Sequence, residues 1–386
     1  MDRPRVEVVA AALPPALDGI GDYAARFAAA LAAHASVGVL AGCGPRPADP
    51  IPGVTVREVF SAADRRSVRS LGPAIAANRP DWVLLQYNPF SFGKWGLNWS
   101  LPTVLGRAVR RGQTRLAVMV HEAFVPCDRP KFAAMSLWQR PQLWRLGRAA
   151  DVVFFSVGLW AERFRPWFPR ARVEHLPVGS NVRRVPIDRD AARRRLGIHN
   201  GAAVLGMFGT GHASRLFHLA AAAAADLRRV GHDPVLLYVG PDVAAARATA
   251  GDLPLIADGA VPPDEVSRRF AAMDLYLSPL IDGVSTRRTT MMTALQHGVP
   301  TIGTHGSNTD PSLRAEDGRS MLLAAVGDDA GFVGRVRRAL EDDRLRATIG
   351  RGGEALYARE FDWPRVVDRA RRAMWLGADD GGPEPR

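Results

Sequence analysis

Cysteine is scarce in this chain of 386 residues, which contains only Cys43 and Cys127. Two cysteines so far apart in the chain cannot form a disulfide framework or a cysteine-rich zinc site. The sequence also lacks an uninterrupted apolar run of about 18 residues, the length that spans a bilayer. Its short N-terminal apolar stretch contains Glu7 and does not have the layout of a signal peptide. These absences predict a protein of a reducing, cytoplasmic compartment, either free or attached peripherally to the inner face of the membrane.

Acidic residues are in deficit, with 39 Asp and Glu against 51 Lys and Arg and a net charge of +12. Such a charge attracts polyanions, phosphorylated ligands or an anionic membrane surface. The arginines are dispersed among the expected helices and no nucleic-acid recognition motif accompanies them, so nucleic acid is the least favoured partner. With 47% hydrophobic and 23% charged residues, the composition is that of a globular protein with room for two or three domains.

Apolar runs of strand length alternate with longer helical stretches along the whole chain, which is the rhythm of βαβ units. This pattern predicts an α/β protein with two Rossmann-like domains, each built on a parallel sheet, that face an interdomain cleft. The expected strands of the first series are 6–12, 37–40, 82–86, 116–121 and 152–156, and those of the second are 203–208, 235–239, 255–258, 275–277 and 301–303.

A Pro/Gly/Asn cluster at 176–181 has the composition of a linker and places the domain boundary near residue 180. We therefore expect an N-terminal, acceptor-side domain over 1–180 and a donor domain over 181–359. An amphipathic helix is expected over 360–377, with Asp362 as its cap and its apolar face packed back toward the N-terminal domain. The last residues, 378–386, are expected to form a disordered tail.

Three strand-to-helix junctions carry glycine, at 18–23, 209–212 and 282–285. Bare backbone N–H groups at such junctions can approach an anion, and the helix N-terminus adds a favourable dipole. Each junction alone is explained as readily by a tight turn that needs a positive φ.

Taken together over nearly the whole chain, these segments resemble the retaining glycosyltransferases of the GT-B fold, in particular glycosyltransferase family four. The resemblance implies transfer of a sugar from a nucleoside-diphosphate sugar to an acceptor hydroxyl, with retention at the anomeric carbon. It implies no metal held by a DxD motif and no further cofactor, because the nucleotide sugar is a substrate. Surface glycan or natural-product biosynthesis is the setting that it suggests.

In the first domain, the resemblance assigns Gly19 and Gly21 to the glycine-rich loop that shapes the cleft. It assigns His121, at the end of an expected strand, to a contact with the donor sugar. Without the resemblance, a strand-end histidine is more often a satisfied structural residue.

In the second domain, the family has Gly-Arg after the first strand and a Lys five residues beyond that Arg. Here Thr210 occupies the Arg position and Arg215 the Lys position, so Arg215 is the expected catalytic cation on the leaving diphosphate. His212, or Arg287 with Arg288, would replace the missing cation. The alternative is that Arg215 is a solvated residue in the first turn of a helix. The donor-binding set at this junction is Thr210, Gly211 and His212.

The family signature of two glutamates separated by seven residues is absent, although its frame remains in 278–285 and in Gly298-Val299-Pro300. Asp282 is assigned to orienting sugar hydroxyls, and ribose recognition stays open. Ser and Thr at a helix start serve equally well as caps. The residues assigned here to donor phosphate or sugar contacts are Gly283, Val284, Ser285 and Thr289.

The acceptor side is expected at Tyr87, Asn88 and Trp95, which follow a predicted strand, although core packing explains such residues at least as well. Tryptophans beside Lys and Arg in 132–148 indicate an interfacial element for anionic lipid. Pro141 interrupts that stretch, so an uninterrupted helix is not expected there. The expected partners are thus a nucleotide sugar, a glycan, lipid-linked or small-molecule acceptor, and an anionic membrane.

Three other functions fit parts of the sequence. A nucleotide-sugar epimerase would keep the nucleotide cleft but add acid and base groups around the sugar. A non-catalytic nucleotide-sugar-binding protein would explain the missing Arg and glutamates. A dehydrogenase is weaker, because Gly209-Thr210-Gly211 lacks the third small residue of the dinucleotide fingerprint.

Overall fold

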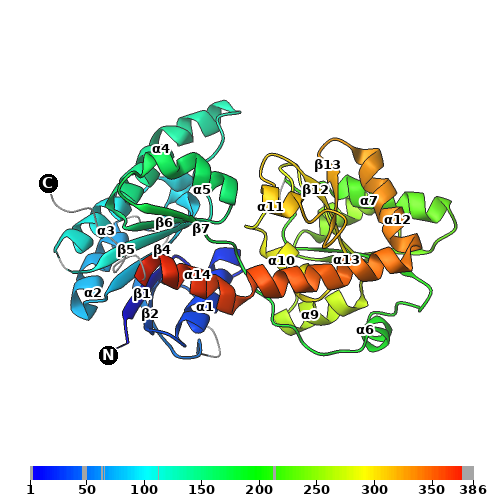
Figure 1. Cartoon of the computed structure of the whole chain (residues 1–386), viewed down its shortest axis with the longest axis horizontal. Coiled ribbons are helices and arrows are strands. Elements are labelled where there is room, and N and C mark those ends of the chain that lie inside the picture. The colour runs from blue at the N-terminus through cyan, green and yellow to red at the C-terminus, as the bar shows by residue number, and fades with distance from the viewer. Residues whose placement is uncertain are drawn as a thin grey trace. The chain divides into compact units, whose positions relative to one another are not determined.

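The computed structural model describes residues 3–45, 50–61, 64, 66–111, 113–211 and 214–375. Contacts divide the chain into two compact units, each of which contains one parallel sheet (Figure 1). The first unit comprises Met1–Pro177 and Trp363–Arg386, and the second comprises Val178–Asp362. The chain thus leaves the first unit three residues before the expected boundary at residue 180 and returns to it at Trp363.

The sheet of the first unit has seven strands in the order β3-β2-β1-β4-β5-β6-β7. All pairings are parallel, and the order reverses direction between β1 and β4, the kind of point where open α/β sheets bind ligands. Two edge strands, β3 and β7, were not predicted, because their half-exposed sequences contain no continuous apolar run. The strands are β1 (Arg5–Ala10), β2 (Ser36–Gly42), β3 (Val54–Phe60), β4 (Trp82–Tyr87), β5 (Arg115–Val120), β6 (Val152–Phe155) and β7 (Arg172–His175).

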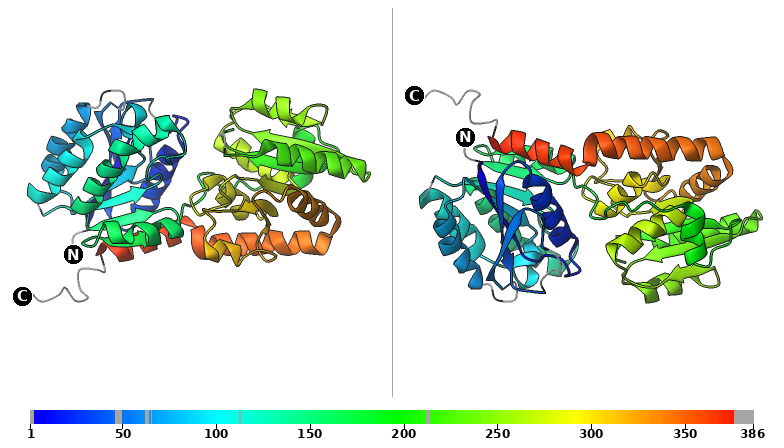
Figure 2. Two further views of the ribbon diagram at one scale, coloured as in Figure 1. Left: turned by 90° about the horizontal axis from the view of Figure 1, so that it is seen from above. Right: turned by 90° about the horizontal axis from the view of Figure 1, so that it is seen from below.

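Helices cover both faces of this sheet. A single apolar cluster packs α2, α3, α4 and α5 on one face, and α14 packs beside α1 (Figure 2). The rings of Tyr23 in α1 and Trp363 in α14 lie 5.3 Å apart. The helices are α1 (Gly19–Leu31), α2 (Leu71–Asn78), α3 (Ser100–Arg111), α4 (Pro130–Ala149), α5 (Gly158–Phe164) and α14 (Trp363–Trp375), with short turns η1 (Ser67–Ser70), η2 (Pro89–Phe92), η3 (Lys94–Gly96) and η4 (Arg165–Trp167).

The expected interruption at Pro141 is wrong, because α4 runs without a break from Pro130 to Ala149. Proline removes the helical donor to the carbonyl of residue 137. Leu137 is 77% exposed, so water can hydrogen-bond that carbonyl in place of the missing N–H.

The second unit contains a six-stranded parallel sheet in the order β10-β9-β8-β11-β12-β13, again with helices on both faces. Two parallel α/β sheets therefore confirm the predicted fold class. The strands are β8 (Ala203–Phe208), β9 (Pro234–Val239), β10 (Leu255–Ala257), β11 (Leu275–Ser278), β12 (Thr301–His305) and β13 (Leu322–Ala325). The helices are α6 (Arg189–Arg195), α7 (Phe217–Arg229), α8 (Val243–Ala250), α9 (Pro263–Ala272), α10 (Thr289–Gln296), α11 (Pro311–Arg314), α12 (Asp329–Glu341) and α13 (Asp343–Leu356).

The C-terminal segment differs in detail from the expected helix over 360–377. A π-helical turn, η5 (Tyr357–Phe361), ends the second unit, and α14 begins only at Trp363. The expected tail at 378–386 lies outside the described residues. Among the described residues, no helix is long and apolar enough to cross a membrane.

Candidate functional site

In the second unit, the loops that follow β8, β11 and β12 meet at one edge of the sheet, because parallel strands end on the same side. Gly209, directly after β8, has φ +108°. A Cβ at this position would lie 2.8 Å from Thr290 Cγ2 and 3.1 Å from Arg215 Nη2. Glycine therefore lets the β8 loop touch both the start of α10 and the Arg215 guanidinium.

Arg215 is held by backbone carbonyls. Its Nη2 donates to the Phe208 carbonyl at 2.8 Å and its Nε to the Thr210 carbonyl at 3.2 Å. Its Nη1 is buried without a hydrogen-bond partner among the described residues, and no carboxylate of the described chain forms an ion pair with it. The residue forms an isolated bridge with Leu280 before α7 begins, so the reading of Arg215 as a solvated residue in a first helical turn is wrong. A fixed, partly buried cation without a carboxylate is suited to an anionic ligand.

Asp282 is surrounded by donors. Arg287 Nη2 lies 2.7 Å from its carboxylate, Arg288 Nη2 lies 3.1 Å away, and Asn308 Nδ2 donates to it at 2.9 Å. Burial acts to raise the pKa of Asp282, but Arg288 and Arg287 together hold that pKa below its ordinary value. Asp282 is therefore a charged group that positions two arginines, and the sugar contact that we expected of it stays a prediction.

The next three residues have different roles from those expected. Gly283 has φ +79°, and a Cβ there would lie 2.2 Å from the Gly306 nitrogen, so this glycine is required by a close backbone approach. Val284 and Ser285 are fully buried. Their side chains pack inside the second unit, and the expected side-chain contacts with a donor do not fit this arrangement.

Thr289 and Thr290 begin α10 and remain partly exposed. Arg288 precedes them and provides no side-chain cap, so the first N–H groups of α10 are not capped by it. Arg288 Nη2 also approaches Ser214 Oγ at 3.5 Å, which joins this loop to the β8 loop. This edge of the second sheet thus carries the guanidinium groups of Arg215, Arg287 and Arg288 beside the start of α10. It also carries one carboxylate, that of Asp282, which is paired with the last two of these arginines.

The remaining residues of the β8 loop that we assigned to donor binding are Thr210, Gly211 and His212. Thr210 is exposed, and the Gly211 N–H donates to Asp242 Oδ2 at 2.6 Å. His212, expected to contribute to donor binding, lies outside the described residues.

In the first unit, the loop after β1 leads into α1. Asp18 Oδ1 caps the helix by accepting from the N–H groups of Ile20 and Gly21, at 2.7 and 3.1 Å. A Cβ at Gly21 would lie 2.8 Å from the Ala12 carbonyl oxygen, whereas a Cβ at Gly19 would meet nothing within 4 Å. Gly21 is thus needed for packing of the loop, and Gly19 leaves open space beside the helix start.

His121 follows β5 at the same edge of the first sheet. Its Nε2 lies 2.8 Å from Gln86 Oε1, and its ring meets the edge of Tyr23 at 4.8 Å between centroids. Because the amide oxygen only accepts, Nε2 carries the proton and donates to it. Burial lowers the pKa of His121 to about 3, so the imidazole is neutral at physiological pH.

A pH dependence of stability follows from two buried histidines, His121 in the first unit and His297 in the second. Burial lowers the pKa of His297 to about 4, whereas an unfolded histidine titrates near about 6.5. Between about pH 6.5 and the pKa of the folded state, about 3 for His121 and about 4 for His297, the unfolded chain therefore binds more protons. In that range the free energy of unfolding should fall by up to about 1.4 kcal/mol per pH unit for each histidine. Above about pH 6.5 neither histidine contributes to the slope.

Urea unfolding at several pH values tests this prediction. Asp22 acts in the opposite direction, because burial raises its pKa to about 6. The change of the free energy of unfolding with pH should therefore be compared between the unmodified chain and the variants His121→Gln and His297→Gln. Parallel pH profiles for all three proteins would contradict the prediction.

The expected acceptor residues separate into three environments. Tyr87 is buried in the apolar cluster under α3 and α4, so its side chain packs the core and does not fit the expected acceptor contact. Asn88 Oδ1 accepts from the Phe90 N–H at 2.9 Å and caps η2. Trp95 is exposed, while its carbonyl accepts from Trp138 Nε1 at 3.0 Å.

Gln86 and Asn308 were missed by sequence reasoning, whereas Thr290 adjoins Thr289 in the run already assigned to donor contacts. Gln86 is the only polar side chain within the buried strand 82–86, and that isolated polarity was a usable signal. Asn308 reaches the site only through the fold of a loop that is distant in sequence, so no local pattern marked it.

Solved structures similar to this chain include GT-B glycosyltransferases. Sucrose-phosphate synthase from Thermosynechococcus elongatus has a TM-score of 0.74 at 16% identity, and covers 97% of this chain and 100% of its own. Anabaena Alr3699/HepE in complex with UDP and glucose has a TM-score of 0.70 at 15% identity, over 97% and 100% of the two chains. A Listeria monocytogenes structure described as a "putative UDP-N-acetylglucosamine 2-epimerase" has a TM-score of 0.60 at 12% identity, over the full length of both chains.

No family model and no curated protein sequence matches this chain. At such low identities the structural similarity shows the fold alone, which is the GT-B fold with two Rossmann-like domains. The described residues contain no group of three or more His, Cys, Asp or Glu that could hold a metal ion.

Proposed function

We propose that the chain transfers a sugar from a nucleoside-diphosphate sugar to an acceptor hydroxyl, with retention at the anomeric carbon. The observation that carries this proposal is Arg215, a partly buried cation without a carboxylate partner in the described chain, beside Gly209 and the start of α10. The similar Anabaena structure holds UDP and glucose on the same fold, which supports a nucleotide-sugar donor.

The chemistry that we propose needs charge stabilisation more than a strong base. The bond between the anomeric carbon and the diphosphate oxygen breaks, and the acceptor oxygen forms its bond on the same face of the sugar. The acceptor proton passes to the departing phosphate. Arg215 and the first N–H groups of α10 would stabilise the negative charge that builds on the diphosphate.

Arg287 and Arg288 would replace the cation that the family has at the position of Thr210. Asp282 holds both guanidinium groups in place, at 2.7 and 3.1 Å. In the first unit, His121 is proposed to contact the sugar as a neutral imidazole whose ring is oriented by Gln86. Two exposed free cysteines, Cys43 and Cys127, support a reducing cytoplasmic setting.

Thermal stabilisation by a panel of UDP-, GDP-, TDP- and ADP-sugars tests the donor, with NAD and NADP as controls. A ligand that binds only the folded chain adds about 2.7 kcal/mol at 100 times its Kd. We expect one nucleotide sugar to raise the melting temperature selectively. Mass spectrometry of the acceptor and NMR of the new anomeric centre then test transfer and retention.

The thermal panel and the product analysis also distinguish the three alternative functions. Release of a free isomerised sugar without an acceptor would favour an epimerase, the function named for the similar Listeria structure. Stabilisation by NAD or NADP alone would favour a dehydrogenase. Tight donor binding with no product from any acceptor would favour a non-catalytic binding protein.

A further inference from the structure

The net positive charge of the chain arises in one part of the first unit. Residues 65–150 contain 14 of the 51 Lys and Arg and 3 of the 39 Asp and Glu, a net charge of +11 out of +12. This stretch includes α2, α3 and α4, which share one face of the sheet (Figure 1). The other 37 Lys and Arg lie elsewhere in the chain, so the excess of positive charge in this stretch arises because Asp and Glu are scarce there.

The exposed aromatic rings gather in the same stretch. Every large aromatic side chain that is exposed among the described residues lies there, with exposed fractions between 42% and 55%. Leu137 in α4 is exposed as well. The four aromatic residues are Phe90, Trp95, Trp99 and Trp144.

Three pairwise contacts occur among the residues of this region, which we call the basic aromatic face. Trp138 in α4 donates to the Trp95 carbonyl at 3.0 Å, and the Arg145 guanidinium lies 6.0 Å from the centre of the Trp99 ring. Arg148 lies 4.7 Å from the centre of the Trp144 ring. The face consists of Lys94, Trp95, Trp99, Leu137, Arg140, Trp144, Arg145 and Arg148.

A cavity of about 690 Å³ opens between α4 and η4 at one end of the basic aromatic face. Arg140, Arg148 and Arg170 line it together with Trp144 and Trp167, and its lining contains no carboxylate. None of these three arginines has an ion pair with a described carboxylate. A cavity with three uncompensated guanidinium groups and aromatic walls suits a phosphate attached to an apolar body.

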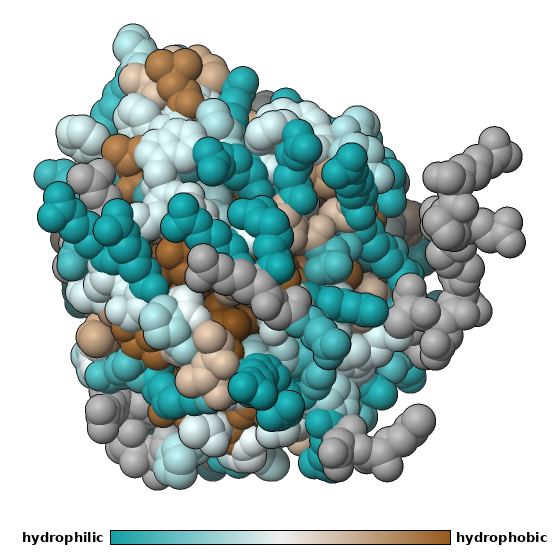
Figure 3. Space-filling model, turned by 90° about the vertical axis from the view of Figure 1, so that its left-hand side faces the viewer, coloured by the Kyte–Doolittle hydropathy of each residue, from teal (hydrophilic) through white to brown (hydrophobic). Residues whose placement is uncertain are grey.

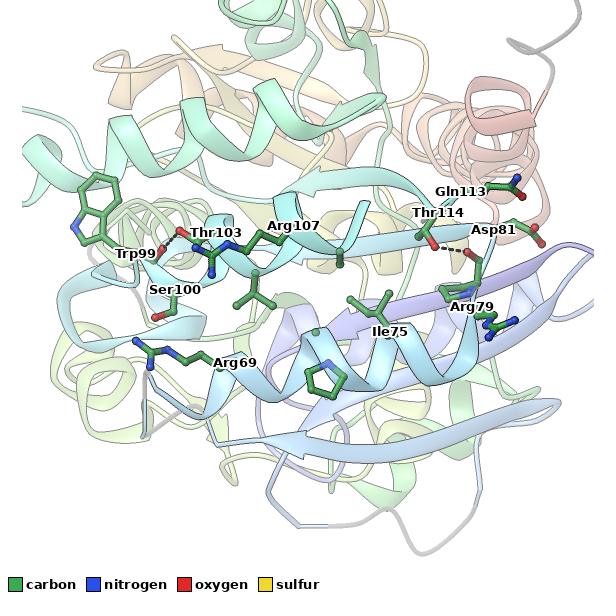
Figure 4. Close-up of a pocket in the computed structure, with 16 residues that line it drawn as sticks. Arg69, Ile75, Arg79, Asp81, Trp99, Ser100, Thr103, Arg107, Gln113 and Thr114 are labelled. Carbon is green, nitrogen blue, oxygen red and sulfur yellow. Dashed lines mark hydrogen bonds between the residues drawn. The ribbon is translucent and has the colours of Figure 1, made fainter. Parts of the chain in front are cut away.

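A second depression adjoins the face at Trp99. This groove of about 1130 Å³ lies between α2 and α3, and Figure 4 shows Arg69 and Arg107 at the same end as Trp99. Its one carboxylate, Asp81, lies at the opposite end and accepts from the Arg5 N–H at 2.7 Å. On this side of the first unit, apolar residues are visible in hollows between hydrophilic side chains (Figure 3).

We propose that the basic aromatic face docks the protein on an anionic phospholipid bilayer. Tryptophan favours the interfacial region of a bilayer, and Lys and Arg are attracted to its negative surface. The arginines of the cavity between α4 and η4 would bind headgroup phosphates, while Leu137 and Trp144 enter the apolar boundary. A nucleic acid or an anionic glycan would satisfy the arginines but would leave Leu137 in water.

Vesicle co-sedimentation tests the electrostatic part, with phosphatidylcholine vesicles that contain or lack phosphatidylglycerol. The variant Arg140→Glu/Arg145→Glu/Arg148→Glu should bind the anionic vesicles at least about 100-fold more weakly, since each lost cation weakens binding by several-fold. The matched control is Arg338→Glu/Arg344→Glu/Arg351→Glu, which makes the same charge change at exposed positions of α12 and α13. This control should bind as the unmodified chain does.

Insertion is tested separately with Leu137→Ser/Trp144→Ser, against Val230→Ser at an exposed apolar position of the second unit. All nine tryptophans belong to the first unit, so brominated lipids should quench their fluorescence in the unmodified chain and less in the double variant. Thermal melts establish that each variant is folded.

Three results would overturn the proposal: equal loss by both charge variants, equal binding to vesicles without phosphatidylglycerol, or tighter binding of heparin or single-stranded DNA than of vesicles. The assays contain no donor sugar, so their outcome is independent of the proposed sugar transfer.

Discussion

Replacing Arg215 by alanine should lower the kcat of sugar transfer by about 10²- to 10³-fold, the loss expected when one fixed donor to a developing negative charge is removed. Arg215 is held by the carbonyls of Phe208 and Thr210 and not by a carboxylate. Its charge would therefore be available to the diphosphate of the proposed donor. Because this interaction strengthens as the diphosphate departs, kcat should fall more than the affinity for the donor.

Steady-state kinetics and a thermal melt of the same protein sample check this expectation. Arg247→Ala is the matched control, because Arg247 also donates to a backbone carbonyl, that of Ala257, but lies in the last turn of α8. It should keep normal turnover. An Arg215→Ala enzyme with normal kcat, or one whose lost activity parallels a lost melting transition, would remove Arg215 from the proposed mechanism.

Replacing Asp274 by alanine should destabilise the second unit by about 3–5 kcal/mol, the range for breaking a buried ion pair from one side. Asp274 accepts from Arg193 Nη2 at 2.6 Å and from the Val204 N–H at 2.7 Å, and it also pairs with Arg189. Arg193 is only 2% exposed. Without Asp274, the guanidinium would remain buried with carbonyl acceptors but no opposite charge.

Urea unfolding measured by far-UV circular dichroism tests this expectation, because it senses both units. Tryptophan fluorescence senses the first unit alone, since all nine tryptophans lie there. The dichroism transition should move to lower urea. Asp252→Ala is the control, because Asp252 pairs with Arg228 at 2.8 Å on the exposed surface and should change little. Equal shifts for the two variants would contradict the argument.

Most of the fold was predictable because central parallel strands are buried on both faces. Such strands read as short apolar runs, as in 116–120 and 152–155. The edge strands β3 and β7 are half exposed, so their sequences mix charged and apolar residues and give no such signal. Pro141 misled the prediction of α4, because a local rule cannot show that the affected turn faces water.

The sequence predicted that Arg215 lies close to the loop at Gly209, and the structure places them together, while the catalytic role of Arg215 stays a prediction. The sequence did not show which neighbours a side chain would have. Only the fold placed Arg287, Arg288 and Asn308 around the Asp282 carboxylate.

The sequence by itself determined the α/β class, the glycine junctions and the excess of positive charge, because each depends on composition or on short-range periodicity. The tertiary structure alone decided which side chains are buried, paired or free to meet a ligand. Burial and pairing depend on residues far apart in the chain, as when α3 and α4 cover Tyr87 or when residues of α6 and β8 surround the Asp274 carboxylate. The sequence already placed the excess of positive charge and the tryptophans of the basic aromatic face in one stretch, and the tertiary structure decided which of the rings are exposed.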